Sequence, residues 1–136
     1  MNSNKINKSK VEQDIYLKMV LFRTQIKLYH FQTNSYSGHK ASDQLITQFD
    51  LLFDQFWEGY QGSRNKRIKL NESNGKLSLY NLNSDKEVKK LCENMKHILR
   101  NEITQFINQS KDSDLFNIRD EILAAINTFL YLISFN

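Results

Sequence analysis

The chain has 136 residues, of which 40% are hydrophobic and 25% are charged, and its formal net charge at pH 7 is +4. This length fits one domain with a single core, and the composition is ordinary for a soluble globular protein. A single cysteine excludes an internal disulfide bond. The mild positive charge fits a polyanionic partner without requiring one, because surface lysines also serve solubility.

Neither a secretory signal nor a membrane span is predicted. Residues 1–8 are polar and contain no apolar core, so we expect a flexible basic tail there. The longest apolar run, residues 122–135, is interrupted by Asn127 and Thr128. It is shorter than the roughly 20 residues that cross a bilayer. We therefore expect a cytoplasmic protein that does not contact membranes.

The chain contains no proline and only four glycines, which favours long helices over a many-stranded sheet. Apolar residues recur at helical spacing over four stretches, about residues 9–32, 39–60, 84–109 and 114–135. Capping-box sequences, Ser9-x-x-Glu12 and Ser84-x-x-Glu87, mark the expected starts of the first and third helices. Gly62 marks the expected end of the second helix.

Residues 63–83 form the one long irregular stretch. Its first part, SRNKRIK, is basic, and its second part alternates apolar and polar residues on both sides of a turn at residues 73–75. That alternation predicts a small hairpin. The sequence thus predicts an all-α, up-down four-helix bundle, formed by residues 9–136 as a single domain. A long irregular or hairpin-containing connection joins helices two and three.

Ionisable residues form a stripe beside the apolar face of the second predicted helix. The stripe consists of His39, Asp43, Asp50, Asp54 and Glu58. At 100° per residue they fall within an arc of about 100°. A solvated acidic stripe is the simplest interpretation. Mixing histidine with carboxylates favours a transition-metal site instead, and the helix lacks the lysines or arginines that would pair with these acids at i+4.

Distance limits how such a site could form. Asp43 and Glu58 are fifteen residues apart, roughly 22 Å along a helix axis, so one helix cannot bring both to one ion. Two antiparallel copies related by a twofold axis near residues 48–50 can do so. His39 and Asp43 of one chain would then face Asp54 and Glu58 of the other. The sequence therefore predicts a site at a dimer interface.

This arrangement resembles the Dps mini-ferritins, ferritin-like proteins that protect DNA in starved cells. It is similar above all to uncharacterised Dps-like proteins of phages and large DNA viruses, which share phrases such as HFQTNSY at residues 30–36 and HKA at residues 39–41. In Dps, one histidine ends the first helix and another opens the second. An aspartate, a second aspartate and a glutamate follow at intervals of four, eleven and four residues. His39, Asp43, Asp54 and Glu58 match these intervals.

The resemblance implies a ferritin-like bundle that oxidises Fe(II) with peroxide or oxygen at a site shared by two subunits of a homodimer, within an oligomer usually of twelve. The implied metal ligands are His30, His39, Asp43, Asp54 and Glu58, with Trp57 and Asp50 as accessory residues. Iron is the expected metal, with zinc or another divalent ion as the alternative. An intracellular location, or association with a virion, follows. The alternative function is a non-catalytic ferritin-like structural or interaction protein with a vestigial metal site.

Basic residues in the tail and in the long connection predict a further contact, with the phosphates of DNA. They are Lys5, Lys8 and Lys10 in the tail, and Arg64, Lys66, Arg67 and Lys69 after the second helix. Contacts of this kind do not depend on base sequence. A solvated tail and loop is the alternative interpretation of the same residues.

Overall fold

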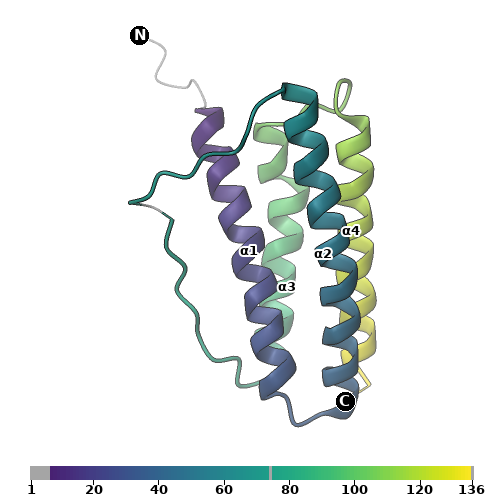
Figure 1. Ribbon diagram of the computed structural model, residues 1–136. Coiled ribbons are helices and arrows are strands. Elements are labelled where there is room, and N and C mark those ends of the chain that lie inside the picture. The colour runs from purple at the N-terminus through teal and green to yellow at the C-terminus, as the bar shows by residue number, and fades with distance from the viewer. Residues whose placement is uncertain (1–6, 74, 136) are drawn as a thin grey trace.

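The structure, a computed structural model, describes residues 7–73 and 75–135. They form α1 (Lys8–Gln32), α2 (Tyr36–Arg64), α3 (Asp85–Arg100), the short 3-10 helix η1 (Glu102–Gln105) and α4 (Ser113–Ile133). The described residues contain no strand, so this part of the chain is all-helical, as predicted (Figure 1). None of its helices is long and apolar enough to cross a membrane.

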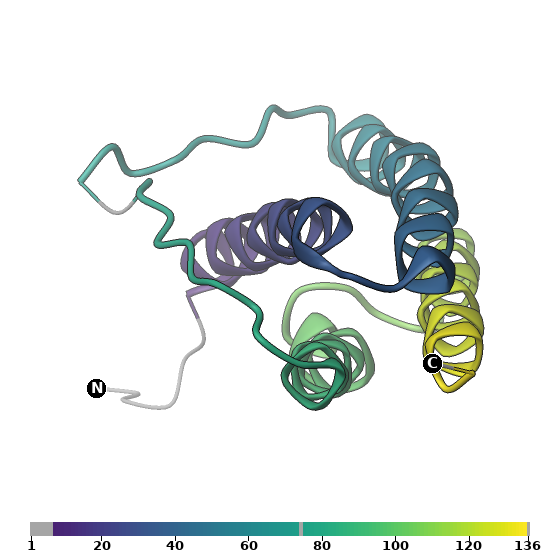
Figure 2. The ribbon, with the colours of Figure 1, turned by 90° about the horizontal axis from the view of Figure 1, so that it is seen from below.

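The four α-helices form a bundle in which every packed pair is antiparallel. α2 packs on α1 and α4, and α3 packs on the same two helices from the opposite corner (Figure 2). Side-chain hydrogen bonds between the helices show which helix ends lie together. Tyr29 of α1 meets Asp85 of α3 at one end of the bundle, and Arg64 of α2 meets Asp112, just before α4, at the other end.

The connection between α2 and α3 sets the order of the helices. Residues 66–73 and 75–84 run beside α1, the first part near one end of the bundle and the second part toward the other end (Figure 1). α3 therefore starts at the end where α2 starts, and these two consecutive helices run parallel. The up-down arrangement holds between neighbours in space but not along the chain at this step. The long irregular connection is confirmed, whereas the hairpin is wrong, since residues 66–73 and 75–83 contain no strand.

Three glutamines of α1 explain why this connection stays extended without a strand partner. Gln25, which is buried, accepts a hydrogen bond from the Tyr80 N–H at 3.0 Å and donates one to the Tyr80 carbonyl at 2.9 Å. Gln32 accepts from the Leu82 N–H at 3.2 Å, and Gln13 accepts from the Asn71 N–H. Side-chain amides thus supply the donors and acceptors that a second strand would have offered.

The predicted start of α3 agrees with the structure, whereas the predicted start of α1 differs from it. Asn7 rather than Ser9 caps α1, which therefore begins at Lys8. The cap of α3 is as predicted, because the Ser84 hydroxyl accepts a hydrogen bond from the Glu87 N–H at 3.3 Å. α3 is shorter than expected, since it ends at Arg100 and the chain continues into η1.

α2 is longer than expected at both ends. Ser35 caps its start, accepting a hydrogen bond from the Gly38 N–H at 3.0 Å. At its end the helix passes through Gly62 and stops at Asn65, whose φ of 50° lies in the left-handed region. Asparagine tolerates that conformation better than most residues, so it replaces the glycine that usually ends a helix.

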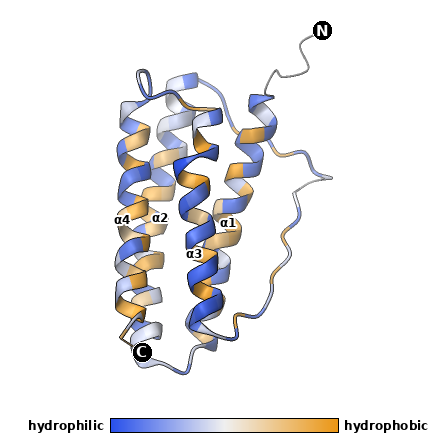
Figure 3. Cartoon of the chain, turned by 180° about the vertical axis from the view of Figure 1, so that it is seen from behind, coloured by the Kyte–Doolittle hydropathy of each residue, from blue (hydrophilic) through white to orange (hydrophobic). Residues whose placement is uncertain are grey.

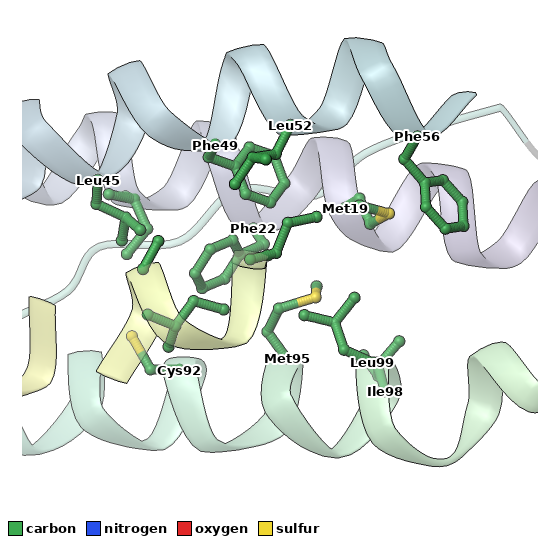
Figure 4. Close-up of a cluster of buried hydrophobic side chains, with 14 of the residues drawn as sticks. Met19, Phe22, Leu45, Phe49, Leu52, Phe56, Cys92, Met95, Ile98 and Leu99 are labelled. Atoms are coloured by element: carbon green, nitrogen blue, oxygen red, sulfur yellow. The ribbon is translucent and has the colours of Figure 1, made fainter. Parts of the chain in front are cut away.

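Buried side chains from all four α-helices fill the centre of the bundle (Figure 4). The largest fully buried ones include Phe22 of α1, Phe49 and Phe56 of α2, and Phe129 of α4. α3 contributes a narrower apolar face, and its outer side is mostly hydrophilic (Figure 3). This core holds α1 and α2 in contact along most of their length, which positions the candidate site.

Candidate metal centre

The two histidines expected at the metal site lie against each other where α1 ends and α2 begins. Their rings are stacked, with centroids 3.8 Å apart and planes inclined at 21°. His30 Nδ1 lies 2.9 Å from the carbonyl oxygen of His39, and His39 Nδ1 lies 2.9 Å from the carbonyl oxygen of His30. His30 is buried and His39 is exposed.

These reciprocal bonds determine where each neutral ring carries its proton. A carbonyl oxygen only accepts hydrogen bonds, so Nδ1 is the protonated nitrogen in both rings. Nε2 of each ring then holds a free lone pair. Neither Nε2 has a hydrogen-bond partner in the described part of the chain. Metal-binding histidines are oriented in the same way, by a bond from the other ring nitrogen to a carbonyl group.

Three of the expected carboxylates, Asp43, Asp54 and Glu58, are exposed along α2. None of them has an ion-pair partner among residues 7–73 and 75–135. Asp43 follows His39 by one turn, and Glu58 follows Asp54 by one turn, so each pair lies on one side of the helix. Both pairs are free to bind a cation.

Asp50 differs from these three because it has a cationic partner. Arg23 of α1 donates to both of its carboxylate oxygens, at 3.0 and 2.9 Å. This bond raises the pKa of the Arg23 guanidinium above its ordinary value. The sequence pattern along α2 alone did not reveal the partner, which comes from another helix. The fork-like contact leaves Asp50 structural in the single chain.

The expected ligands form two separate groups within one chain. His30, His39 and Asp43 lie at the start of α2, whereas Asp54 and Glu58 lie near its end. In the described residues, no three side chains of histidine, cysteine, aspartate or glutamate come together in a way that could hold a metal ion. A single chain therefore offers two partial ligand sets, as helical rise predicts.

Trp57 lies between the second ligand group and the core. It is buried and stacks on Phe106 at 5.9 Å, with planes 9° apart. Tyr16 approaches its edge at 5.6 Å. Its Nε1 is buried, and no acceptor for it is found in the described part of the molecule. Aromatic packing rather than hydrogen bonding holds this ring in place.

The residues expected to contact DNA fall into three groups. Lys5 lies outside the described residues. Arg64 and Lys66 form ion pairs within the chain, with Asp112 at 2.7 Å and Glu12 at 3.1 Å. The remaining ones, Lys8, Lys10, Arg67 and Lys69, are exposed. Among the described residues expected to contact DNA, this last group has no ion pair within the chain.

One buried polar cluster was not expected from the sequence. Glu12, predicted to complete a capping box, is instead 4% exposed and accepts hydrogen bonds from the Tyr60 hydroxyl and the Lys66 ammonium group. Burial first, and the bond to Glu12 second, raise the pKa of Tyr60 well above its ordinary value. No pattern in the sequence pointed to this cluster, because its three members come from α1, α2 and the connection.

The comparisons with known proteins give one family and no relatives. Residues 30–133 match a family described as a family of unknown function, DUF5856. No curated protein and no solved structure matches the chain. The matched range starts at His30 and covers α2, the connection, α3 and α4. It therefore includes all five expected metal ligands.

Proposed function

The chain belongs to DUF5856, a family of unknown function, and from that premise we propose that it binds a divalent transition metal at a site shared by two copies of the chain. The ligands in this proposal are His30, His39 and Asp43 from one subunit and Asp54 and Glu58 from its partner. Iron is the metal that the Dps-like ligand spacing favours. The function would then be Fe(II) binding and oxidation, as in a ferritin-like protein.

The stacked histidine pair is the observation that carries this proposal. The two rings are stacked, and each is held by a hydrogen bond from its Nδ1 to the backbone carbonyl of the other histidine. Both Nε2 atoms lack a hydrogen-bond partner in the described part of the chain. Such bonds fix the orientation of the ring and reduce the entropy lost when a metal binds.

The donor types fit iron. Imidazole and carboxylate ligands together suit Fe(II), and also Zn(II), better than they suit calcium or magnesium, which prefer oxygen ligands alone. Fe(II) would be the substrate, giving up an electron to an oxidant such as peroxide. The chain would contribute ligands that hold the ion and, through the neighbouring Trp57, an aromatic ring beside the second ligand pair.

The position of the acids explains why a second chain is required. Asp54 and Glu58 are exposed and unpaired in the described chain, yet they lie about fifteen residues from His39 and Asp43 along the same helix. Antiparallel contact of two α2 helices brings the unlike ends together. Twofold symmetry then creates two equivalent sites. A dodecamer, the usual assembly of Dps proteins, would contain six such dimers.

The arrangement of helices supports the ferritin-like part of the proposal. A bundle whose second and third helices are joined by one long connection is the organisation that ferritin-like proteins use. In this chain the connection follows an extended path and contains no short helix among its described residues. The likeness therefore concerns the bundle and its helix order.

Metal analysis tests the proposal. Protein purified without chelator should contain iron or zinc by inductively coupled plasma analysis, and should oxidise Fe(II) faster than buffer alone. His39→Ala together with Asp43→Ala should lower metal affinity at least about tenfold, because two direct ligands are lost. His97→Ala is the matched control, since His97 is the third histidine and lies exposed on α3. Unchanged iron uptake in the double variant would refute the site.

A non-catalytic structural or interaction protein is the second candidate. It is favoured by the separation of the two ligand groups, which gives one described chain no three-ligand site. Mass measurement in solution distinguishes the candidates. A dimer or dodecamer supports the shared site, whereas a stable monomer lacks the partner's carboxylates and supports the second candidate.

A further inference from the structure

A cavity of about 400 Å³ opens where α1, α2 and the long connection meet. Its aromatic walls are Tyr16 of α1 and Phe53 and Trp57 of α2, and its aliphatic wall is Ile68 and Leu70 of the connection. The ring of Tyr16 lies 5.5 Å from that of Phe53 and 5.6 Å from that of Trp57. The cavity is thus lined by rings on one side and by alkyl groups on the other.

The aliphatic wall is fixed in place by hydrogen bonds. Gln61 of α2 accepts a bond from the Ile68 N–H at 2.9 Å, and Gln13 of α1 accepts one from the Asn71 N–H. Leu70 lies between these two attachment points. Because the backbone is held on both sides, the cavity does not depend on a freely moving loop.

Asp54 and Glu58 also line the cavity, and both are exposed. Neither has an ion-pair partner in the described chain, and no lysine or arginine lines the cavity. Arg67 and Lys69 alternate with Ile68 and Leu70 along the extended connection. Ile68 and Leu70 line the cavity, whereas Arg67 and Lys69 do not. The cavity is therefore locally negative in a chain of net charge +4.

We propose that this cavity binds an alkylammonium group, with the ammonium on Asp54 and Glu58 beside the Tyr16 ring and the alkyl chain against Ile68 and Leu70. Carboxylates and aromatic faces both attract a cation, and rings stabilise one that has lost part of its water. A bare metal ion would leave the aliphatic wall unused. The proposal does not use the histidine pair, but it shares Asp54 and Glu58 with the proposed metal site, so an alkylammonium group and a metal ion would compete for these carboxylates.

Trp57 gives a direct measurement, because it is the only tryptophan of the chain and it lines the cavity. The experiment titrates the full chain with n-butylammonium chloride at constant ionic strength, with a chelator present so that no metal occupies the carboxylates. A saturable change in tryptophan fluorescence is expected. Neutral n-butanol has the same alkyl chain and should cause at most a small change.

Variants identify the residues that bind. Asp54→Asn with Glu58→Gln should weaken butylammonium binding at least about tenfold, since both charge-assisted contacts are lost. Tyr16→Leu should weaken it several-fold, while Tyr16→Phe keeps the ring face and should preserve binding. Asp43→Asn lies outside the cavity and should leave the fluorescence response unchanged, although it should impair metal binding. Far-UV circular dichroism confirms that each variant is folded.

Two further probes separate the sources of the group. Tighter binding of spermidine supports a free polyamine, and tighter binding of Nα-acetyl-lysine methylamide supports a lysine side chain of a partner. The proposal is overturned if butanol and butylammonium act alike, or if the carboxylate variants bind butylammonium as the wild type does. Failure of metal binding alone would remove the function proposed above and leave this result standing.

Discussion

Gly38 shows how one missing side chain fixes the corner between α1 and α2. A Cβ atom added there would lie 2.4 Å from the Tyr29 hydroxyl oxygen and 3.0 Å from Thr33 Oγ1. Contacts that short force the neighbouring groups to move. The histidine pair lies at the same corner between α1 and α2.

Gly38→Ala should therefore destabilise the protein by about 1–3 kcal/mol, the usual cost of overpacking. Urea unfolding followed by circular dichroism measures this change. Gly62→Ala is the matched control, because a Cβ at Gly62 meets no atom within 4 Å and the residue lies within α2. That substitution should stabilise the helix by up to about 1 kcal/mol. If both variants have equal stability, the close approach at Gly38 is wrong.

Tyr60 makes the stability of the folded protein depend on pH in the alkaline range. Its pKa is raised in the folded protein by burial and by the hydrogen bond to Glu12. The folded state thus favours the protonated phenol, so this contribution is complete below pH 10, the ordinary pKa of tyrosine, and decreases as pH rises above it. The unfolding free energy should fall by about 1.4 kcal/mol per pH unit from this residue alone. Tyr60→Phe should show a shallower fall between pH 10 and 11.5 in urea unfolding, and identical slopes would contradict the buried hydrogen bond.

At the scale of elements, the connection between α2 and α3 depends on glutamine side chains rather than on backbone pairing. Gln25 is fully buried and forms two bonds with the backbone of Tyr80. Exposed apolar residues of the connection, such as Leu79, contribute little burial. The path of this segment is therefore determined by polar contacts with glutamines of α1 and with Gln61 of α2, together with the buried side chain of Leu82.

Gln25→Met should release the connection from α1 and leave the helix formed. Losing both bonds to Tyr80 should cost about 1–3 kcal/mol, because the backbone groups lose their partners. Hydrogen exchange by mass spectrometry should show faster exchange in residues 76–83, with α1 and α4 unchanged. Gln55→Met, at an exposed position of α2, is the matched control. Faster exchange throughout the bundle would mean that the connection is part of the core.

Asp112 joins the end of α2 to the start of α4 through Arg64. The bond from Arg64, partly opposed by burial, holds the pKa of Asp112 below its usual value. A lowered pKa contributes stability that is present above about pH 4 and is lost as the carboxylate is protonated in acid. Asp112→Asn should destabilise the protein at pH 7 by about 3 kcal/mol, because Arg64 loses its charged partner. Its stability should also change less between pH 5 and 2 than that of the wild type, as measured by thermal unfolding.

The helices could be predicted from sequence much better than their connection. Periodic apolar residues located all four α-helices, since each buries one face in the same core. The path of the connection could not be predicted, because Gln25 and Gln32 bond to residues 50 or more positions away and leave no periodic signal. The candidate ligands were placed by spacing along one helix. The stacking of His30 on His39 depends on the α1–α2 corner, which spacing does not reveal.

At the scale of the whole molecule, the unpaired cations expected to contact DNA, among the described residues, gather at one end of the bundle, called the basic end here. The exposed cations Lys8, Lys10, Arg67 and Lys69 lie near the start of α1 and the end of α2, which is the same end of the bundle (Figure 1). His30, His39 and Asp43 lie at the opposite end, where α1 ends and α2 begins. A polyanion bound at the basic end would leave the histidine corner free.

Weak, sequence-independent DNA binding should follow from this basic end. Gel shifts at low salt should show retardation of duplex DNA that disappears as salt rises, because counterion release drives the binding. Replacing Lys8, Lys10, Arg67 and Lys69 by glutamine should abolish the shift. Replacing Lys86, Lys89 and Lys90, which are exposed on α3 at the other end, is the control. No retardation of wild-type protein at low salt would end this proposal.

The shared metal site is tested most directly by mixing two inactive variants. His39→Ala/Asp43→Ala lacks one ligand group, and Asp54→Ala/Glu58→Ala lacks the other, so neither alone should bind iron. When the two are unfolded together and refolded as a mixture, half of the dimers should be mixed, and each mixed dimer restores one of its two sites. About a quarter of the wild-type iron binding should therefore return. If the refolded mixture binds no more iron than the separate variants, the site is not shared between subunits.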